Sequence, residues 1–130
     1  MTPQLETLAR DLIDGPHSAI LSTSDSEGRP QSSVIFVIYD DDSIVFSTIK
    51  GRLKTRNMNR NPWVSLLILS KTSSQYVNIR GKVDITEDRE NFHDVVYGRY
   101  MDGATPPPEP EAERLIVRIT PDRIYAFPPA

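Results

Sequence analysis

The 130-residue chain contains no cysteine and only two histidines. Without cysteine there can be no disulfide, no thiolate metal ligand and no cysteine nucleophile, and this composition fits a cytoplasmic protein. His17 and His93 lie far apart in unrelated contexts, so a zinc site or a Ser-His-Asp relay has almost nothing to build on. The sequence therefore predicts no metal site, and it contains no residue that we can assign as catalytic.

Long hydrophobic runs and glycine-rich phosphate loops are also missing. No segment approaches the roughly 20 apolar residues of a membrane span, and the N-terminal stretch MTPQLETLARDLIDG carries acids without a continuous apolar core. Neither the P-loop pattern nor GxGxxG occurs. We therefore expect a protein without a signal peptide or membrane span, folded as a single domain over residues 1–130.

A further absence is local, because residues 43–83 contain no Asp or Glu. These residues hold eight of the fifteen bases of a chain whose net charge is −3. The remaining segments hold seven bases and all eighteen acids. Such asymmetry suggests an anionic partner for the middle region. The alternative is a solvent-exposed helix face whose positive charge is balanced by acidic residues that fold nearby.

The bases are densest in the stretch STIKGRLKTRNMNRNP, residues 47–62. Four-residue spacing places Arg52, Arg56 and Arg60 on one stripe of a short helix, and it places Lys50 and Lys54 on an adjoining stripe. Like charges at this spacing repel by a few tenths of a kcal/mol per pair. A bound anion would relieve this repulsion.

A compact phosphorylated small molecule suits this stretch better than a polymer does. Lysine and arginine around a helix start hold phosphate through charge-assisted hydrogen bonds, and the Ser47 and Thr48 hydroxyls with backbone N–H groups would complete the shell. A nucleic acid fits less well, because the helix lacks interleaved aromatic residues and the chain is acidic overall. If the ligand is a redox cofactor, the protein needs no nucleophile of its own.

Hydrophobic periodicity and turn residues predict a mainly β fold, a six- to seven-stranded antiparallel barrel with short flanking helices. Helical spacing predicts a helix over residues 4–14 and a second over 87–100 with Thr86 as its N-cap. We expect Gly81 to mark a bulge and the proline-rich segment 102–112 to be an extended surface loop. Strands are expected over residues 17–23, 31–39, 43–48, 63–69, 75–85 and 114–120, with 123–127 continuing the last one beyond Pro121.

Three segments carry a resemblance to a known family: GRPQSSVIFVI (28–38), FSTIKGRLKTRNMNRNPWVSLLI (46–68) and RITPDRIYAF (118–127). They resemble the pyridoxamine 5'-phosphate oxidase-like, FMN-binding split-barrel family, over nearly the whole chain and most weakly from 87 to 112. More narrowly, KTRNMNRNPWVSLL and RIYAFPP resemble the branch that binds the deazaflavin coenzyme F-420 in actinobacteria and relatives. The resemblance implies a split β-barrel homodimer with the cofactor in a groove between the subunits.

The same resemblance implies two sets of cofactor-binding residues. One set would bind the cofactor phosphate, and a second set, on the second strand, would lie against its tricyclic ring. The apolar strand that begins at Trp63 and the segment Gln75–Val77 become interface candidates. The phosphate set comprises Lys50, Arg52, Lys54, Arg56, Ser47 and Thr48, and the ring set comprises Gln31, Ser32, Ser33 and Val34.

One departure from the family bears on the choice of cofactor. Pyridoxamine phosphate oxidases carry an arginine and a lysine on the second strand, whereas residues 33–39 here read SVIFVIY and have no charge. This disfavours FMN binding in their manner and vitamin B6 oxidation. F-420 has an additional anionic oligoglutamate tail. Bases that continue outward along the helix would bind this tail, and Arg60 and Lys71 are candidate contacts.

We therefore predict an F-420-dependent oxidoreductase. It would transfer a hydride between the deazaflavin and an unsaturated or carbonyl-bearing small molecule. Two alternatives stay open: an FMN-dependent oxidoreductase of the same family, and a non-catalytic carrier of a flavin or deazaflavin.

Overall fold

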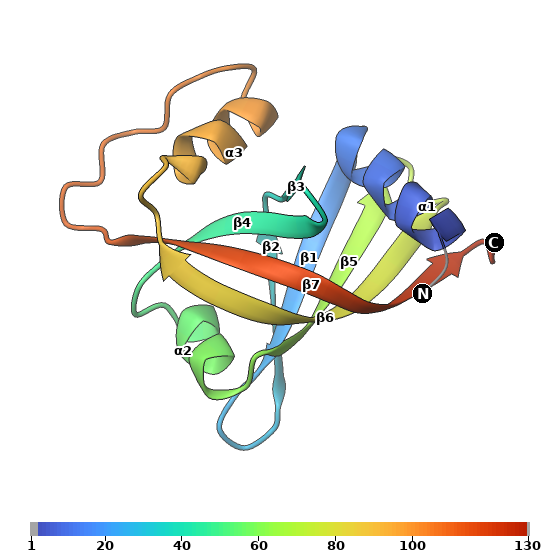
Figure 1. The fold of residues 1–130 in the computed structure, drawn as a ribbon, viewed down its shortest axis with the longest axis horizontal. Helices are drawn as coiled ribbons and strands as arrows, with labels where there is room; N and C mark the ends of the chain where they lie inside the picture. Colours follow the sequence, from blue (N-terminus) through green and yellow to red (C-terminus); the bar gives the residue numbers. More distant parts are fainter. Residues whose placement is uncertain (1–2, 130) are drawn as a thin grey trace.

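The computed structural model describes residues 3–129 as one seven-stranded antiparallel sheet with three short helices (Figure 1). The mainly β fold predicted from the sequence is confirmed. None of the helices between residues 3 and 129 has the length and apolarity that crossing a bilayer requires. The elements are α1 (Pro3–Asp14), β1 (His17–Ser24), β2 (Pro30–Ile35), β3 (Ile38–Asp40), β4 (Ser43–Ile49), α2 (Leu53–Arg60), β5 (Trp63–Ser70), β6 (Tyr76–Glu87), α3 (Phe92–Tyr100) and β7 (Arg114–Phe127).

The strand order closes the sheet into a split barrel. In the order β2-β1-β5-β6-β7-β4-β3, two strands that are consecutive in the chain lie at opposite edges. β2 ends at Ile35 and β3 begins at Ile38. Three Cα–Cα steps of about 3.8 Å reach at most about 11 Å. The sheet must therefore curl until its two edges nearly meet, and we call the line where they face each other the seam.

The predicted single strand over residues 31–39 is wrong, because the chain changes partner at Phe36 and Val37. Before this point the strand pairs with β1, and after it the strand pairs with β4. Both halves are rich in β-branched and aromatic residues, and no glycine, proline or polar turn residue separates them. The sequence therefore resembles one continuous strand even though it crosses the seam.

The hydroxyl of Tyr100, at the end of α3, bonds to the backbone that the seam leaves without a strand partner. It accepts a hydrogen bond from the Val37 N–H at 2.9 Å and donates one to the Val37 carbonyl at 3.0 Å. The Tyr100 ring stacks on Phe36 with 4.1 Å between the centroids, and its hydroxyl also contacts His17. Burial raises the pKa of Tyr100. These contacts hold α3 across the seam.

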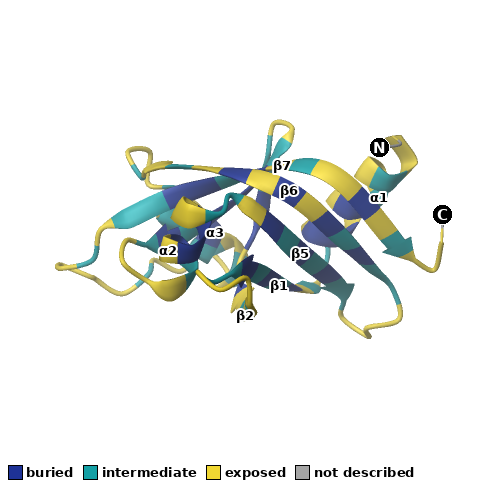
Figure 2. Cartoon of the chain, turned by 90° about the horizontal axis from the view of Figure 1, so that it is seen from below, coloured by how far each residue is buried: buried dark blue, intermediate teal, exposed yellow. Residues whose placement is uncertain are grey.

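One apolar core fills the barrel, and α1 covers one end of it. Alternate residues of β1 and β5 are buried in this core (Figure 2). Ala9, Leu12 and Ile13 of α1 are buried in the same core. A smaller cluster, which includes Val45 and Val96, joins α3 to the other face of β4. β4 is therefore covered on both faces.

The predicted bulge at Gly81 is confirmed. The register between β6 and β7 shifts between Arg80 and Gly81. A Cβ at position 81 would lie 2.6 Å from the Thr120 carbonyl oxygen, so a side chain does not fit there. β7 continues past Pro121 as one strand to Phe127.

The helix predicted over residues 87–100 starts later than predicted. α3 begins at Phe92 with Asn91 at its N-cap, and Thr86 is still part of β6. Pairing with β7 extends β6 to Glu87, so this pairing overrides the helical pattern at that point. The Asp88 carboxylate accepts the first amide hydrogens of the helix, from Phe92 at 2.9 Å and His93 at 3.0 Å.

We expect Tyr100→Phe to lower the free energy of unfolding by about 1–3 kcal/mol, because the backbone groups of Val37 lose a buried partner. The stack on Phe36 is kept in this variant. Urea unfolding measures the change, and Tyr125→Phe is the control, since Tyr125 is 45% exposed. If both variants lose the same small amount, the Tyr100 hydroxyl does not stabilise the seam.

Candidate functional site

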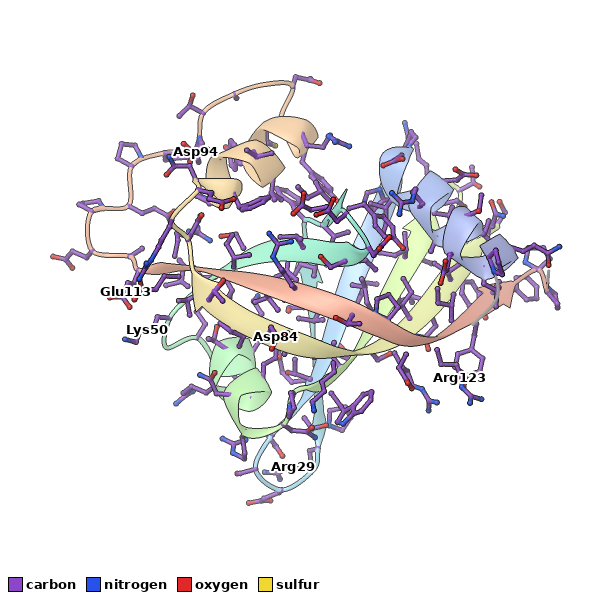
Figure 3. The ribbon with its side chains drawn as sticks, in the orientation of Figure 1. Arg29, Lys50, Asp84, Asp94, Glu113 and Arg123 are labelled. Atoms are coloured by element: carbon purple, nitrogen blue, oxygen red, sulfur yellow. The ribbon has the colours of Figure 1, made fainter. Side chains whose placement is uncertain are left out.

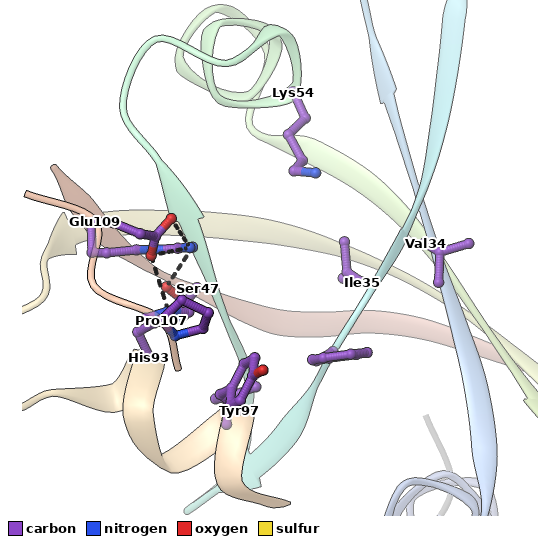
Figure 4. Close-up of a pocket in the computed structure, with 11 residues that line it drawn as sticks. Val34, Ile35, Ser47, Lys54, His93, Tyr97, Pro107 and Glu109 are labelled. Carbon is purple, nitrogen blue, oxygen red and sulfur yellow. Dashed lines mark hydrogen bonds and ion pairs between the residues drawn. The ribbon is translucent and has the colours of Figure 1, made fainter. Parts of the chain in front are cut away.

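A cavity of about 350 Å³ lies at the seam, between α2, α3 and the proline-rich loop (Figure 4). This volume is at the lower end of the range for small-molecule sites. Its lining combines apolar and aromatic side chains with two bases, one acid and one histidine. The lining residues are Val34, Ile35, Phe36, Ser47, Lys54, His93, Val96, Tyr97, Pro107, Glu109 and Arg114.

Strand pairing and the Tyr100 contacts bring these distant segments together. β4 pairs with β7 so that Ile49 lies opposite Arg114, which places the start of β7 beside the end of β4. The Tyr100 hydroxyl holds α3 at the seam, and His93 and Tyr97 of that helix then line the cavity. The site is therefore a product of barrel closure and of the docking of α3.

Lys54 is the base of α2 that lines the cavity. Its ammonium lies 3.4 Å from the Ser33 hydroxyl, and no carboxylate in residues 3–129 forms an ion pair with it. Burial lowers the pKa of Lys54, and the charges of Arg52 and Arg114 lower it further. A partly buried cation among other cations and without a counter-ion is suited to bind an anion.

Buried polar contacts fix α2, and with it Lys54. The hydroxyls of Thr48 and Thr55 lie 3.1 Å apart, and Thr55 donates to the Ile49 carbonyl at 3.0 Å. Asn57 is fully buried and donates to the Thr23 hydroxyl at 3.0 Å. These bonds tie the helix to β1 and β4. Thr48, a predicted phosphate contact, is 2% exposed and does not line the cavity.

Glu109 of the proline-rich loop is bound at the cavity by Arg114. Arg114 donates from Nη2 to Glu109 Oε1 at 2.7 Å and from Nε to the same oxygen at 3.1 Å. Its Nη2 also donates to Glu109 Oε2 at 2.9 Å. His93 Nε2 lies 3.3 Å from the same carboxylate, although the ring is not oriented for a hydrogen bond. Arg114, then His93 and Arg52, lower the pKa of Glu109, so it is a carboxylate at neutral pH.

Four of the predicted residues gather at this cavity. Val34, Ser47 and Lys54 line it, and Ser33 contacts Lys54. Val34 is 72% exposed, which leaves its side chain open to a ligand or to another subunit. Their part in cofactor binding stays a prediction.

The other predicted bases of this region lie outside the lining. Lys50 points to the surface and pairs with Glu113 at 3.2 Å (Figure 3). Arg52, at the N-cap of α2, and Arg56, on the helix, are both exposed. Arg52 acts on the site through its charge, since it lowers the pKa of Lys54.

Gln31 and Ser32 precede Ser33 on β2 and are not among the lining residues. Gln31 donates to the Ser32 carbonyl at 3.1 Å. The candidate tail contacts, Arg60 at the end of α2 and Lys71 after β5, are both exposed.

Sequence reasoning missed Phe36, His93, Tyr97, Glu109 and Arg114 as lining residues. Phe36 lies two residues after Val34 in the predicted strand, whereas the other four reach the cavity through long-range contacts that no local pattern encodes. One local signal was present. Glu109, in the proline-rich segment, precedes Arg114 by five residues, and the two side chains form an ion pair at the end of the loop.

A single antiparallel sheet that closes at a seam is the fold of the split-barrel proteins. The sequence profile described as pyridoxamine 5'-phosphate oxidase matches residues 5–127. The chain belongs to this family.

Two curated relatives overlap the chain in part. A dihydrophenazinedicarboxylate synthase from Pseudomonas chlororaphis is 33% identical over 79 residues, which make up 60% of this chain and 36% of that protein. A pyridoxine/pyridoxamine 5'-phosphate oxidase from Streptomyces avermitilis is 32% identical over 77 residues, 58% of this chain and 34% of that protein. The match thus spans little more than a third of either relative.

Solved structures match over more of the chain. An F-420 reductase superposes with a TM-score of 0.79 at 29% identity, and the match covers 88% of this chain and 94% of that one. General stress protein 26 from Bacillus anthracis superposes with a TM-score of 0.77 at 23% identity, over 98% of this chain and 96% of that one. At the latter identity the likeness supports the fold alone.

We expect Lys54→Met to stabilise the ligand-free protein at neutral pH, because folding places a charge in a site that disfavours it. The folded pKa of Lys54 lies below the ordinary value of 10.5. Between these two values the unfolded chain binds more protons, so the free energy of unfolding rises with pH. The variant lacks this rise.

Unfolding temperatures between about pH 7 and about pH 10 measure the difference between wild type and variant. Lys71→Met, at an exposed turn, is the matched control and should follow the wild type. A constant difference between Lys54→Met and wild type across this range would contradict the lowered pKa.

Proposed function

We propose that the protein is an F-420-dependent oxidoreductase that transfers a hydride between the deazaflavin and an unsaturated or carbonyl-bearing small molecule. The observation that carries this proposal is the ammonium of Lys54, which has no counter-ion within residues 3–129 and lies beside a cavity with an apolar and aromatic lining. A cation beside an apolar and aromatic surface suits a ligand that has an anionic end and a flat ring. The chain has no cysteine, and the described residues contain no cluster of metal ligands, so a redox cofactor is the simplest source of chemistry.

The residues present fit such a cofactor. Lys54 and the Ser33 hydroxyl would hold the phosphate, with Arg52 adding charge. Val34, Phe36 and other apolar lining residues would exclude water from the ring. When bound, the deazaflavin supplies the hydride donor or acceptor. The chain's own residues bind, orient and shield it.

F-420 is favoured over FMN by two features. The F-420 reductase structure matches most of the chain at 29% identity. The exposed bases Arg56 and Arg60 lead away from Lys54 along α2, as an anionic tail would require. An FMN-dependent oxidoreductase is the second candidate, and membership of the pyridoxamine 5'-phosphate oxidase family supports it.

We expect Lys54→Met to weaken binding of the cofactor by about tenfold or more, because a hydrogen bond to a charged group is worth about 1.5–3 kcal/mol. Titration of the purified protein with F-420 and with FMN, followed by fluorescence, measures both affinities. Lys71→Met controls for a general loss of positive charge. If neither cofactor binds the wild type, the proposed function is wrong.

Binding alone does not separate an enzyme from a carrier. The reduced cofactor should be oxidised faster in the presence of the protein with at least one member of a panel of quinones, enones and tetrapyrroles. Cofactor binding without acceleration by any of these compounds would favour the non-catalytic carrier.

We also propose that the protein forms a homodimer with the cofactor at the subunit interface. Large apolar side chains are exposed on β5 and β7, the two strands that flank β6: Trp63 is 49%, Tyr125 45% and Phe127 51% exposed. Tyr125 and Phe127 lie two residues apart on β7, and exposed apolar side chains that lie close together mark an interaction site. Light scattering should give twice the 14.7 kDa chain mass, and Trp63→Lys should shift it to the single-chain mass. A monomeric wild type would contradict the dimer.

A further inference from the structure

The carboxylate of Glu109 lines the cavity together with the cations Lys54 and Arg114. Arg114 holds it with N···O distances of 2.7 to 3.1 Å, which is the forked geometry that recognises carboxylate and phosphate. His93 and the charge of Arg52 act on the same carboxylate. Lys54 lines the same cavity and has no counter-ion in the described chain. Lys54 and Arg114 thus line a cavity in which the one carboxylate among the described lining residues, Glu109, is bound by Arg114.

We propose that Glu109 is an internal placeholder for the oxyanion of the ligand, and that Arg114 binds this oxyanion once Glu109 has left. The oxyanion is a phosphate or carboxylate group. Where it belongs to the cofactor, the inference rests on the proposed function. Where it belongs to a substrate, the inference stands without it. No bond is made or broken in the exchange, since one oxyanion replaces another at the guanidinium.

Partial exposure makes the pair displaceable. The side chains of Arg114 and Glu109 are 24% and 32% exposed, so water screens their attraction. A phosphate carries more charge than one carboxylate, and it would meet Lys54 as well as Arg114. A ligand oxyanion can therefore compete with Glu109, whereas an uncharged ligand cannot.

The exchange would also free the proline-rich loop. Between Thr105 and Glu111, every hydrogen bond and ion pair that reaches the rest of the described chain is made by Glu109. The four prolines of this segment cannot donate backbone hydrogen bonds. Loss of the Glu109 side-chain contacts leaves residues 105–111 without polar ties to α3 or β7. Binding of a ligand oxyanion to Arg114 and release of this segment would therefore occur together.

A spin label on the loop tests the exchange without a cofactor. Because the chain has no cysteine, Thr105→Cys provides a unique attachment site. Inorganic phosphate should mobilise the label, and sodium chloride at the same ionic strength should not. In a Glu109→Gln background the label should be mobile without phosphate. If phosphate leaves the label unchanged, and Glu109→Gln does so too, the proposal is wrong.

Flavin affinities identify the source of the oxyanion. Glu109→Gln should tighten FMN binding roughly tenfold, because the phosphate no longer competes with a charged carboxylate. Riboflavin, which has the ring without the phosphate, should bind wild type and variant equally. Glu111→Gln removes a charge from the same loop outside the cavity and should bind FMN as wild type does.

The two proposals fail in different ways. If phosphate mobilises the label but neither FMN nor F-420 binds, the placeholder stands and the proposed function is wrong. If a cofactor binds wild type and Glu109→Gln with equal affinity, and phosphate does not mobilise the label, Glu109 is a fixed latch for the loop. That result overturns the placeholder and leaves the proposed function standing.

Discussion

The structure depends on the two-residue link between β2 and β3. Because Phe36 and Val37 join opposite edges of one sheet, the sheet must close. Closure leaves the Val37 backbone without a strand partner, and the Tyr100 hydroxyl bonds to both of its polar groups. That contact places α3 across the seam, and α3 with the following loop borders the cavity. One short connection thus determines the barrel, the position of a helix and the site.

The electrostatics of the cavity follow from this geometry. Pairing of β4 with β7 places Arg114 near the start of α2, and buried Thr55 and Asn57 fix that helix. Lys54 then lies among other cations and has no counter-ion in the part of the chain that the structure describes. This arrangement is unfavourable for the ligand-free protein and favourable for an anion. A stability cost at a binding residue is common where function requires a charge in a partly buried place.

Local signals predicted most of the fold and part of the site. Alternating strands, turn residues and the Gly81 bulge were evident because each depends on neighbouring residues. The seam was not, since SVIFVIY has uniform β propensity and a change of partner leaves no mark in it. Lys54 and Ser47 lie in one recognisable stretch. Arg114 and Glu109 reach them only through the pairing of β4 with β7 and the return of the loop, and such contacts have no local pattern.

A crystal structure of the protein with F-420 bound tests the central claim most directly. We expect the phosphate within hydrogen-bonding distance of Lys54 Nζ and the ring against Val34 and Phe36. A separate hollow of about 490 Å³ is lined by residues that include Trp63 and Arg80. Cofactor density in that hollow, with Lys54 still without an anion, would contradict the account.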